Sequence, residues 1–367
     1  MRRHRRPTAL PALSLVILAA LIGCGRAAHD PPRRLTPAGL ASSTRLPRRF
    51  LPTSARDTAA PPSLQALVTA PTEDRLLVVD LRSGRVTRQI PIPGSPGYVA
   101  TIGSGGPVLV ASPTADTVTM LGGASLHPTT VLHGFAHPDI PAIAPGGGYA
   151  YLSEGAPGRV AVIRLTDDKV VSRPFVGAGA HHFAFSPNLQ QVWVALGQSA
   201  ATIAILTTVV SRPPPPSSVW GDPGHPRLVG RFRPGYPAHD LLFTPDGAQV
   251  WITSADGPDV GVFSAHTHRL LFRVPAGPPP QHVAFDGRYA YLTSGYGSRI
   301  EQVSLTTGRI PKQAAAPNGS FELDAAGGYV VTSSLLRGTL AIYNTRLQLL
   351  RVRHIAPSAQ DVTLYQP

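Results

Sequence analysis

The segment Val250-Trp251-Ile252-Thr253 is one of seven similar apolar tetrapeptides that recur along this chain. The other six are Ala66-Leu67-Val68-Thr69, Val108-Leu109-Val110-Ala111, Ala150-Tyr151-Leu152-Ser153, Val192-Trp193-Val194-Ala195, Ala290-Tyr291-Leu292-Thr293 and Tyr329-Val330-Val331-Thr332. The spacings between the second residues of these tetrapeptides, in chain order, are 42, 42, 42, 58, 40 and 39 residues. A period near 40 that consists only of short strands predicts one blade of a β-propeller per repeat.

Each repeat can be divided into four strands, as in the unit with strands at 182–185, 192–195, 202–206 and 227–232. The sequence therefore predicts an all-β, seven-bladed propeller of four-stranded blades. Its first recognisable strand, at 66–69, is a second strand, whereas the last, at 361–365, is a lone inner strand. We expect the C-terminal strand to pair into blade one and close the ring, because closure removes exposed strand edges.

The N-terminus has the features of an export signal. Residues 1–23 combine four arginines with an apolar run that is short for a membrane span. The run ends in Leu21-Ile22-Gly23-Cys24, which resembles the lipobox of bacterial lipoproteins. The resemblance implies cleavage before Cys24, lipidation of its thiol, and a location on the outer face of the cytoplasmic membrane. The alternative is a plain signal peptide with an incidental cysteine. Because Cys24 is the only cysteine, the chain has no intrachain disulfide and no zinc–thiolate site.

Composition separates the remaining chain into two parts. Residues 24–62 are rich in Pro and Arg and have no apolar period, so they predict a disordered tether. Residues 63–367 form the predicted propeller. The formal net charge of the chain is +13, but only +4 remains on the propeller after the signal and tether are removed. This modest charge argues against nucleic-acid binding. A proline-rich insertion at 212–222 accounts for the long spacing of 58 residues, and its role stays open.

The repeats resemble the YVTN (YncE-like) β-propeller family. The resemblance rests on Val250-Trp251-Ile252-Thr253-Ser254, on Asp259-Val260-Gly261-Val262-Phe263 and on Gln281-His282-Val283-Ala284-Phe285-Asp286-Gly287. It covers about residues 65–367 and implies an extracytoplasmic seven-bladed propeller, with motifs that specify the fold rather than a reaction. The chain departs from the family pattern because it lacks the Thr-Asn pair at the end of the second strand.

Polar residues recur just before the apolar runs of the inner strands. They are Tyr98, Asp139, His182, Asp240, His282, Ser320 and Asp361, preceded in four repeats by His181, His239, Gln281 and Gln360. The predicted candidate site, a ring at the channel mouth, consists of Asp139, His182, His239, Asp240, His282 and Asp361. His and Asp can bind a divalent metal ion or act as acid and base. The alternative is structural, because polar residues at strand entrances also cap backbone groups.

These observations favour a binding or scaffold function. We predict a monomeric, membrane-anchored lipoprotein of the bacterial cell envelope that presents the propeller to a protein or a small ligand. The alternative is a lactonase-like or metal-dependent hydrolase that uses the His/Asp ring. The sequence contains no haem-attachment, His-Glu-x-x-His, Gly-x-Ser-x-Gly or phosphate-loop motif, so it does not favour an enzyme.

Overall fold

The computed structural model describes residues 64–197, 201–209, 221–279 and 281–367. These residues belong to one compact unit, 57–367. The predicted signal peptide, Cys24 and the tether lie outside the described residues, as do residues 212–220 of the proline-rich insertion.

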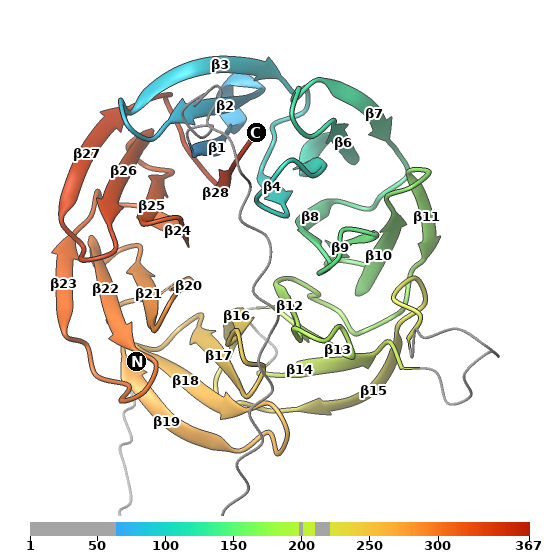
Figure 1. Ribbon diagram of the computed structural model, residues 1–367. Helices are drawn as coiled ribbons and strands as arrows, with labels where there is room; N and C mark the ends of the chain where they lie inside the picture. Colours follow the sequence, from blue (N-terminus) through green and yellow to red (C-terminus); the bar gives the residue numbers. More distant parts are fainter. Residues whose placement is uncertain (1–63, 198–200, 210–220, 280) are drawn as a thin grey trace, which may run out of the picture. The chain divides into compact units, whose positions relative to one another are not determined.

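The described residues form seven antiparallel sheets of four strands, arranged as blades around a central axis (Figure 1). The predicted seven-bladed propeller is therefore confirmed. From the axis outward, blades one to three are β28 (Val362–Tyr365), β1 (Gln65–Ala70), β2 (Arg75–Asp80) and β3 (Arg85–Pro91); β4 (Tyr98–Thr101), β5 (Val108–Ser112), β6 (Thr117–Leu121) and β7 (Pro128–Leu132); and β8 (Pro138–Ile143), β9 (Tyr149–Glu154), β10 (Arg159–Arg164) and β11 (Lys169–Ser172).

The other four blades follow in chain order. Blades four and five are β12 (Phe183–Phe185), β13 (Gln191–Ala195), β14 (Ile203–Thr207) and β15 (Arg227–Phe232); and β16 (Ala238–Phe243), β17 (Gln249–Ser254), β18 (Asp259–Ser264) and β19 (Leu270–Pro275). Blades six and seven are β20 (Val283–Asp286), β21 (Tyr289–Ser294), β22 (Arg299–Ser304) and β23 (Lys312–Ala315); and β24 (Ser320–Ala326), β25 (Tyr329–Ser334), β26 (Thr339–Asn344) and β27 (Leu349–His354). Two short 3-10 turns, η1 (Pro71–Glu73) and η2 (Pro113–Ala115), each begin with a proline.

The second strands are buried on both faces because each blade packs between two neighbours. The repeated large residues Tyr151, Trp193, Trp251 and Tyr291 are all fully buried. The seven main hydrophobic clusters therefore lie between adjacent blades rather than around one centre. This packing explains why the apolar tetrapeptides are the strongest signal in the sequence.

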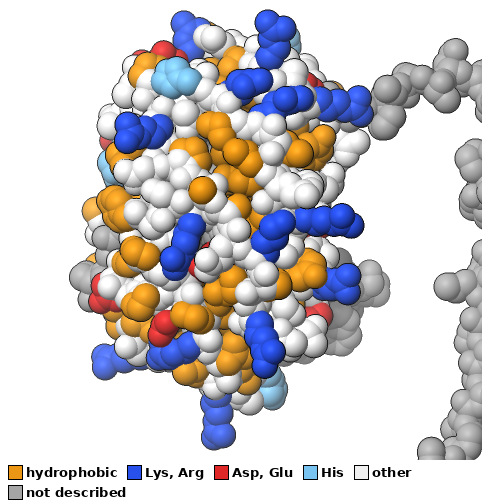
Figure 2. All heavy atoms as spheres, turned by 90° about the vertical axis from the view of Figure 1, so that its left-hand side faces the viewer, with side chains coloured by type: hydrophobic (Ala, Val, Ile, Leu, Met, Phe, Trp, Pro, Cys, Tyr) orange, Lys and Arg blue, Asp and Glu red, His pale blue; other side chains and the backbone are white. Residues whose placement is uncertain are grey.

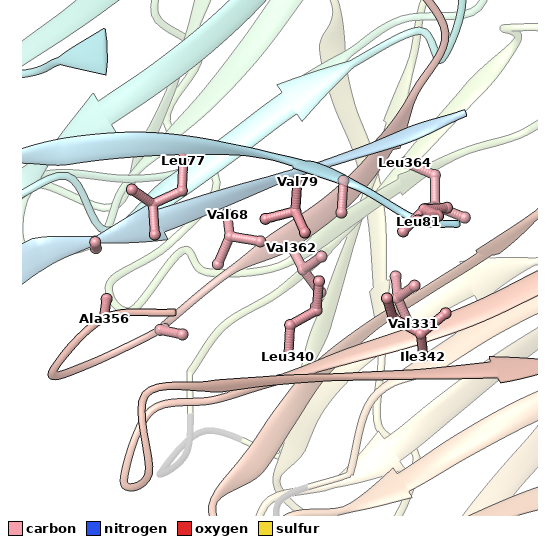
Figure 3. Packing of buried hydrophobic residues seen from close by; sticks show 13 residues of the cluster. Val68, Leu77, Val79, Leu81, Val331, Leu340, Ile342, Ala356, Val362 and Leu364 are labelled. Atoms are coloured by element: carbon pink, nitrogen blue, oxygen red, sulfur yellow. The ribbon is translucent and has the colours of Figure 1, made fainter. Parts of the chain in front are cut away.

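The ring closes in the predicted way. Strand β28 pairs antiparallel with β1, with Leu364 opposite Ala66 and Val362 opposite Val68. Figure 3 shows that Val362 and Leu364 also pack against blade seven, represented by Leu340. The C-terminal strand thus joins the two ends of the chain's folded part through both hydrogen bonds and apolar packing.

The outer strands form the rim of the propeller. All six residues of β27 are exposed, and the strand carries Arg351 and Arg353 between aliphatic side chains. Figure 2 shows cationic and hydrophobic side chains interspersed over one part of this rim. Charged side chains on an edge strand discourage pairing with the edge of another molecule. Among the described residues, no helix is long and apolar enough to cross a bilayer.

Candidate functional site at the channel mouth

The polar residues that were predicted to form a ring lie at the starts of inner strands that surround the central axis (Figure 1). The structure brings most of them into contact and adds His181 and Glu322. We define the mouth cluster as Asp139, His181, His182, His239, Asp240, His282, Glu322 and Asp361. Its members come from blades one, three, four, five, six and seven, so residues separated by more than 200 positions meet at one place.

Four histidines form the centre of the mouth cluster. Ring centroids lie 4.5 Å apart for His181 and His182, 5.0 Å for His182 and His239, and 4.6 Å for His239 and His282. The Nε2 atoms of His239 and His282 are only 2.9 Å apart, which is hydrogen-bond distance. His182, His239 and His282 are all buried. Residues of this type rarely gather in a protein interior unless polar partners or a ligand compensate for their desolvation.

Carboxyl groups contact three of the four rings. An oxygen of Asp139 lies 3.2 Å from Nε2 of His181. The two oxygens of Asp240 lie 3.5 Å from Nδ1 of His182 and 3.6 Å from Nδ1 of His282. Glu322 is closer to His282, with 3.1 Å between its Oε2 and Nδ1. These contacts orient the rings, and they leave the second nitrogen of each ring for another partner.

The protonation of the histidines differs with their neighbours. Burial lowers the pKa of His181 and His182, and it lowers that of His239 to about 2 with help from His282 and His181. Burial acts in the same direction on His282, but the charges of Glu322 and Asp240 outweigh it and raise the pKa of His282 to about 9. The cluster therefore favours three neutral imidazoles and one imidazolium at neutral pH.

The pKa values of three acids of the mouth cluster are raised. Burial raises the pKa of Glu322, and the nearby acids Asp361 and Asp240 add to this effect. Burial likewise raises the pKa of Asp139, and that of Asp361 to about 6. Acids that are buried close to one another gain free energy from any cation that can reach them.

Two of the predicted ring aspartates have a structural role as well. Asp240 accepts hydrogen bonds from the backbone N–H of Leu241, at 2.7 Å, and from that of Val283 in the next blade, at 3.2 Å. Asp361 accepts equivalent bonds from Val362 and from Val99, both at 2.7 Å. These bonds tie consecutive inner strands together, as the structural alternative predicted for such residues. The contacts recorded for the rings of His182, His239 and His282 are instead with carboxylates and with one another.

Sequence reasoning missed Glu322 and named Ser320 as the polar residue before the inner-strand run of blade seven. In blade seven, Leu323 pairs with Thr332 as Leu241 pairs with Ile252 in blade five, so Glu322 rather than Ser320 is equivalent to Asp240. Pro141 pairs with Leu152 as Leu241 pairs with Ile252, so Asp139 is equivalent to His239 rather than to Asp240. A signal was present, because Glu322 lies 40 residues after His282 and 39 residues before Asp361, close to the period of the repeat.

A small pocket of about 150 Å³ opens beside the mouth cluster. Its lining includes Tyr98, His239, His282, Tyr296, Phe321 and Glu322. The rings of Tyr296 and Phe321 meet edge to face with 5.2 Å between their centroids, and Tyr296 is 63% exposed at the rim. The pocket thus has aromatic walls and a floor with a carboxyl group and two imidazoles. This combination suits a small ligand that is apolar on its sides and charged at one end.

Comparisons with known proteins support the fold. No protein-family model and no curated protein matches the chain. Solved structures similar to it include hydrazine synthase from Kuenenia stuttgartiensis (TM-score 0.64, 13% identity, 82% of this chain and 100% of that chain). A functionally unknown protein from Desulfotomaculum acetoxidans has a TM-score of 0.68 at 16% identity, over 83% of this chain and 99% of that chain. The dihydro-heme d1 dehydrogenase NirN, in complex with DHE, has a TM-score of 0.57 at 14% identity, over 85% of this chain and 77% of that chain.

Those structural neighbours include two different enzymes and a protein of unknown function, and they share little sequence with the chain. They show a β-propeller and nothing about the ligand of this one, because propellers carry many unrelated functions. Membership of the YVTN family and lipidation at Cys24 stay predictions from sequence.

Proposed function

We propose that this protein is a binding module of the cell envelope that captures a small organic cation in the mouth pocket. The observation that carries the proposal is the presence of three aromatic rings and one partly buried carboxyl group in the same pocket, namely Tyr98, Tyr296, Phe321 and Glu322. Aromatic faces attract cations through their negative electrostatic potential, and a carboxylate completes the charge pairing.

The electrostatics of the pocket support a cationic rather than an anionic ligand. Burial raises the pKa of Tyr98 above its usual range, and the negative charges of Asp139, Glu322 and Asp361 raise it further. The phenol therefore experiences the negative potential that these acids create at the mouth. His282 offsets only part of it, because burial favours the neutral forms of the other three histidines of the mouth cluster.

The size of the pocket limits the ligand to a few heavy atoms. A volume of about 150 Å³ accommodates a small alkylammonium group, whereas most pockets for drug-sized ligands are at least about twice as large. The exposed ring of Tyr296 would form one side of the entrance, and its edge contact with Phe321 holds the aromatic wall in place.

The cellular setting of the proposal rests on the N-terminal sequence. Lipidation at Cys24 would hold the propeller on the outer face of the cytoplasmic membrane, and residues 24–62 would act as a tether. A binding module in this position would meet small solutes of the envelope.

Calorimetric titration of the full chain, purified in detergent and treated with a chelator, tests the proposal. The probes are choline and 3,3-dimethylbutan-1-ol, which has the same shape but no charge. We expect choline to bind more tightly than the neutral probe. Phe321→Ala and Glu322→Gln should each lower the affinity for choline by at least tenfold.

The matched controls are Phe175→Ala and Glu73→Gln, which change an exposed aromatic ring and an exposed carboxylate elsewhere on the propeller. These variants should bind choline like the unmodified protein. Equal affinity for the two probes, or no binding of either, would contradict the proposal.

A further inference from the structure

Three histidines of the mouth cluster also meet the geometric requirements of a metal site. His181 and His182 precede β12 in blade four, and His239 lies in β16 of blade five. Each offers one ring nitrogen such that the three nitrogens lie within 4.8 Å of one another. For comparison, two nitrogens bound to one tetrahedral zinc ion, each about 2.0–2.1 Å from it, are roughly 3.3 Å apart. Small rotations of the three rings would therefore bring the nitrogens to binding distance.

Carboxyl groups already hold two of these three rings. Asp139 contacts Nε2 of His181 at 3.2 Å, and Asp240 contacts Nδ1 of His182 at 3.5 Å. A metal-binding histidine usually donates its other ring N–H to a carboxylate or a carbonyl, which fixes the orientation of the ring. With Nδ1 of His181 and Nε2 of His182 as the ligand atoms, the contacts of Asp139 and Asp240 would supply this arrangement for two histidines at once.

The third ring has an unpartnered nitrogen. His239 is more than nine-tenths buried, and its Nδ1 has no hydrogen-bond partner among the described residues. The other nitrogen, Nε2, faces Nε2 of His282 at 2.9 Å. A buried polar atom without a partner is destabilising by about 1–3 kcal/mol, so its retention calls for an explanation. A metal ion bound by the ring would satisfy the nitrogen.

A second group, formed by His182, His282 and Glu322, also has its ligand atoms within 4.8 Å of one another. It differs because two of its members already contact each other, with 3.1 Å between Oε2 of Glu322 and Nδ1 of His282. The group of three histidines has no such internal pairing. It is therefore the better metal site of the two.

We propose that His181, His182 and His239 bind one divalent transition-metal ion, with Asp139 and Asp240 as positioning residues. Three imidazole ligands suit Zn²⁺, Co²⁺, Ni²⁺ or Cu²⁺ rather than Ca²⁺ or Mg²⁺, which prefer oxygen ligands. A site with three protein ligands keeps a fourth position open. The inference goes beyond the binding of an organic cation, because the pocket shares only His239 with the three proposed ligands.

Titration of the chelator-stripped full chain with Zn²⁺, followed by calorimetry, tests the metal site. We expect one Zn²⁺ per chain, with affinity reduced at least 100-fold in both His181→Gln and His239→Gln. Asp139→Asn keeps all three ligands and should lower affinity by about 10- to 100-fold, the range typical of outer-shell carboxylates. Because Asp139 is a positioning residue, Asp139→Asn should leave the stoichiometry at one.

The control variant is His266→Gln, which changes a histidine at a turn remote from the mouth cluster and should bind Zn²⁺ like the unmodified protein. Thermal unfolding in chelator identifies any variant that fails to fold. If His181→Gln or His239→Gln does not fold, the affinity of Asp139→Asn for Zn²⁺ still tests the inference. No Zn²⁺ binding by the folded protein, or undiminished binding by His181→Gln and His239→Gln, would overturn the inference.

Each of the two proposals can be refuted without the other. Choline is measured in chelator, so loss of Zn²⁺ binding with retained choline binding removes only the metal site. Zn²⁺ binding without choline binding removes only the proposed function. Failure of both measurements on a folded protein would leave the mouth cluster with the structural role that Asp240 and Asp361 already have.

Discussion

The Nε2 atoms of His239 and His282 lie 2.9 Å apart, although the two rings belong to inner ends of neighbouring blades. One nitrogen must donate a proton and the other must accept it. His282 is the donor at neutral pH, because Glu322 and Asp240 favour its charged form whereas burial keeps His239 neutral. In the absence of metal, the proton of neutral His239 then lies on Nδ1, which is the atom without a partner. A metal ion bound at Nδ1 would displace this proton, and the proton of His282 would then be shared with Nε2 of His239.

Replacement of His239 should change how stability depends on pH. The pKa of His239 is lowered to about 2 in the folded protein from an ordinary value of 6.5. Below pH 6.5 the unfolded chain therefore gains a proton that the folded chain does not, and the unmodified protein loses stability as the pH falls. Relative to it, His239→Phe should gain about 1.4 kcal/mol for each pH unit below 6.5.

Urea unfolding in chelator between pH 5 and pH 7.5 measures this difference. The acids of the mouth cluster titrate in both proteins, so the difference reports mainly on His239. Leu350→Ala, which changes an exposed side chain on the rim and removes no titratable group, is the control and should give a flat difference. A flat difference for His239→Phe as well would mean that His239 is protonated in the folded state.

Loss of the closing strand should destabilise the whole ring. Deletion of residues 358–367 removes β28, exposes the edge of β1 and uncovers the cluster around Leu340 and Val68. We expect aggregation or a large fall in Tm, measured by circular dichroism and light scattering. The milder Leu364→Ala should cost about 2–5 kcal/mol, as other buried leucines do, whereas Leu350→Ala on the exposed rim should cost little. A deletion variant that melts like the full chain would refute the closure.

Asp324 offers a test of the bonds between blades that leaves the pocket untouched. Its carboxylate accepts hydrogen bonds from Ala325 N–H and from Leu364 N–H in the next blade, both at 2.7 Å. Asp324→Ala leaves two buried donors unsatisfied, so we expect a loss of about 1–3 kcal/mol for each. Chemical denaturation measures the loss, with Glu73→Ala as the exposed control. Choline and Zn²⁺ affinities should stay unchanged, and a variant as stable as the unmodified protein would show that these bonds are dispensable.

Anchoring depends on a residue that only the sequence describes. If Cys24 is lipidated, Cys24→Ala should leave an uncleaved precursor or release the protein into the aqueous phase. Detergent phase partitioning and intact mass measure both outcomes. The control is Ser43→Ala in the tether, which should partition like the unmodified protein. A mature protein without added acyl mass would exclude the lipoprotein hypothesis.

The repeat by itself determined the architecture of this protein. Leu67, Tyr151, Trp251 and their counterparts mark the second strands, because a strand buried between two blades must be apolar at nearly every position. The lone inner strand at the C-terminus likewise predicted the closure. Both features follow from local pattern and from the avoidance of open edges, which a sequence displays directly.

Only the tertiary structure decided which polar side chains meet. Glu322 escaped the sequence analysis because the apolar Phe321 was taken as the start of the inner-strand run, whereas the pairing of Leu323 with Thr332 puts Glu322 at the position of Asp240. The difference between Asp361, which binds the backbone of the next blade, and His239, whose Nδ1 has no partner, also depends on contacts between blades. Polar residues at the starts of the inner strands thus acquire different roles, because their neighbours across the channel come from distant parts of the chain.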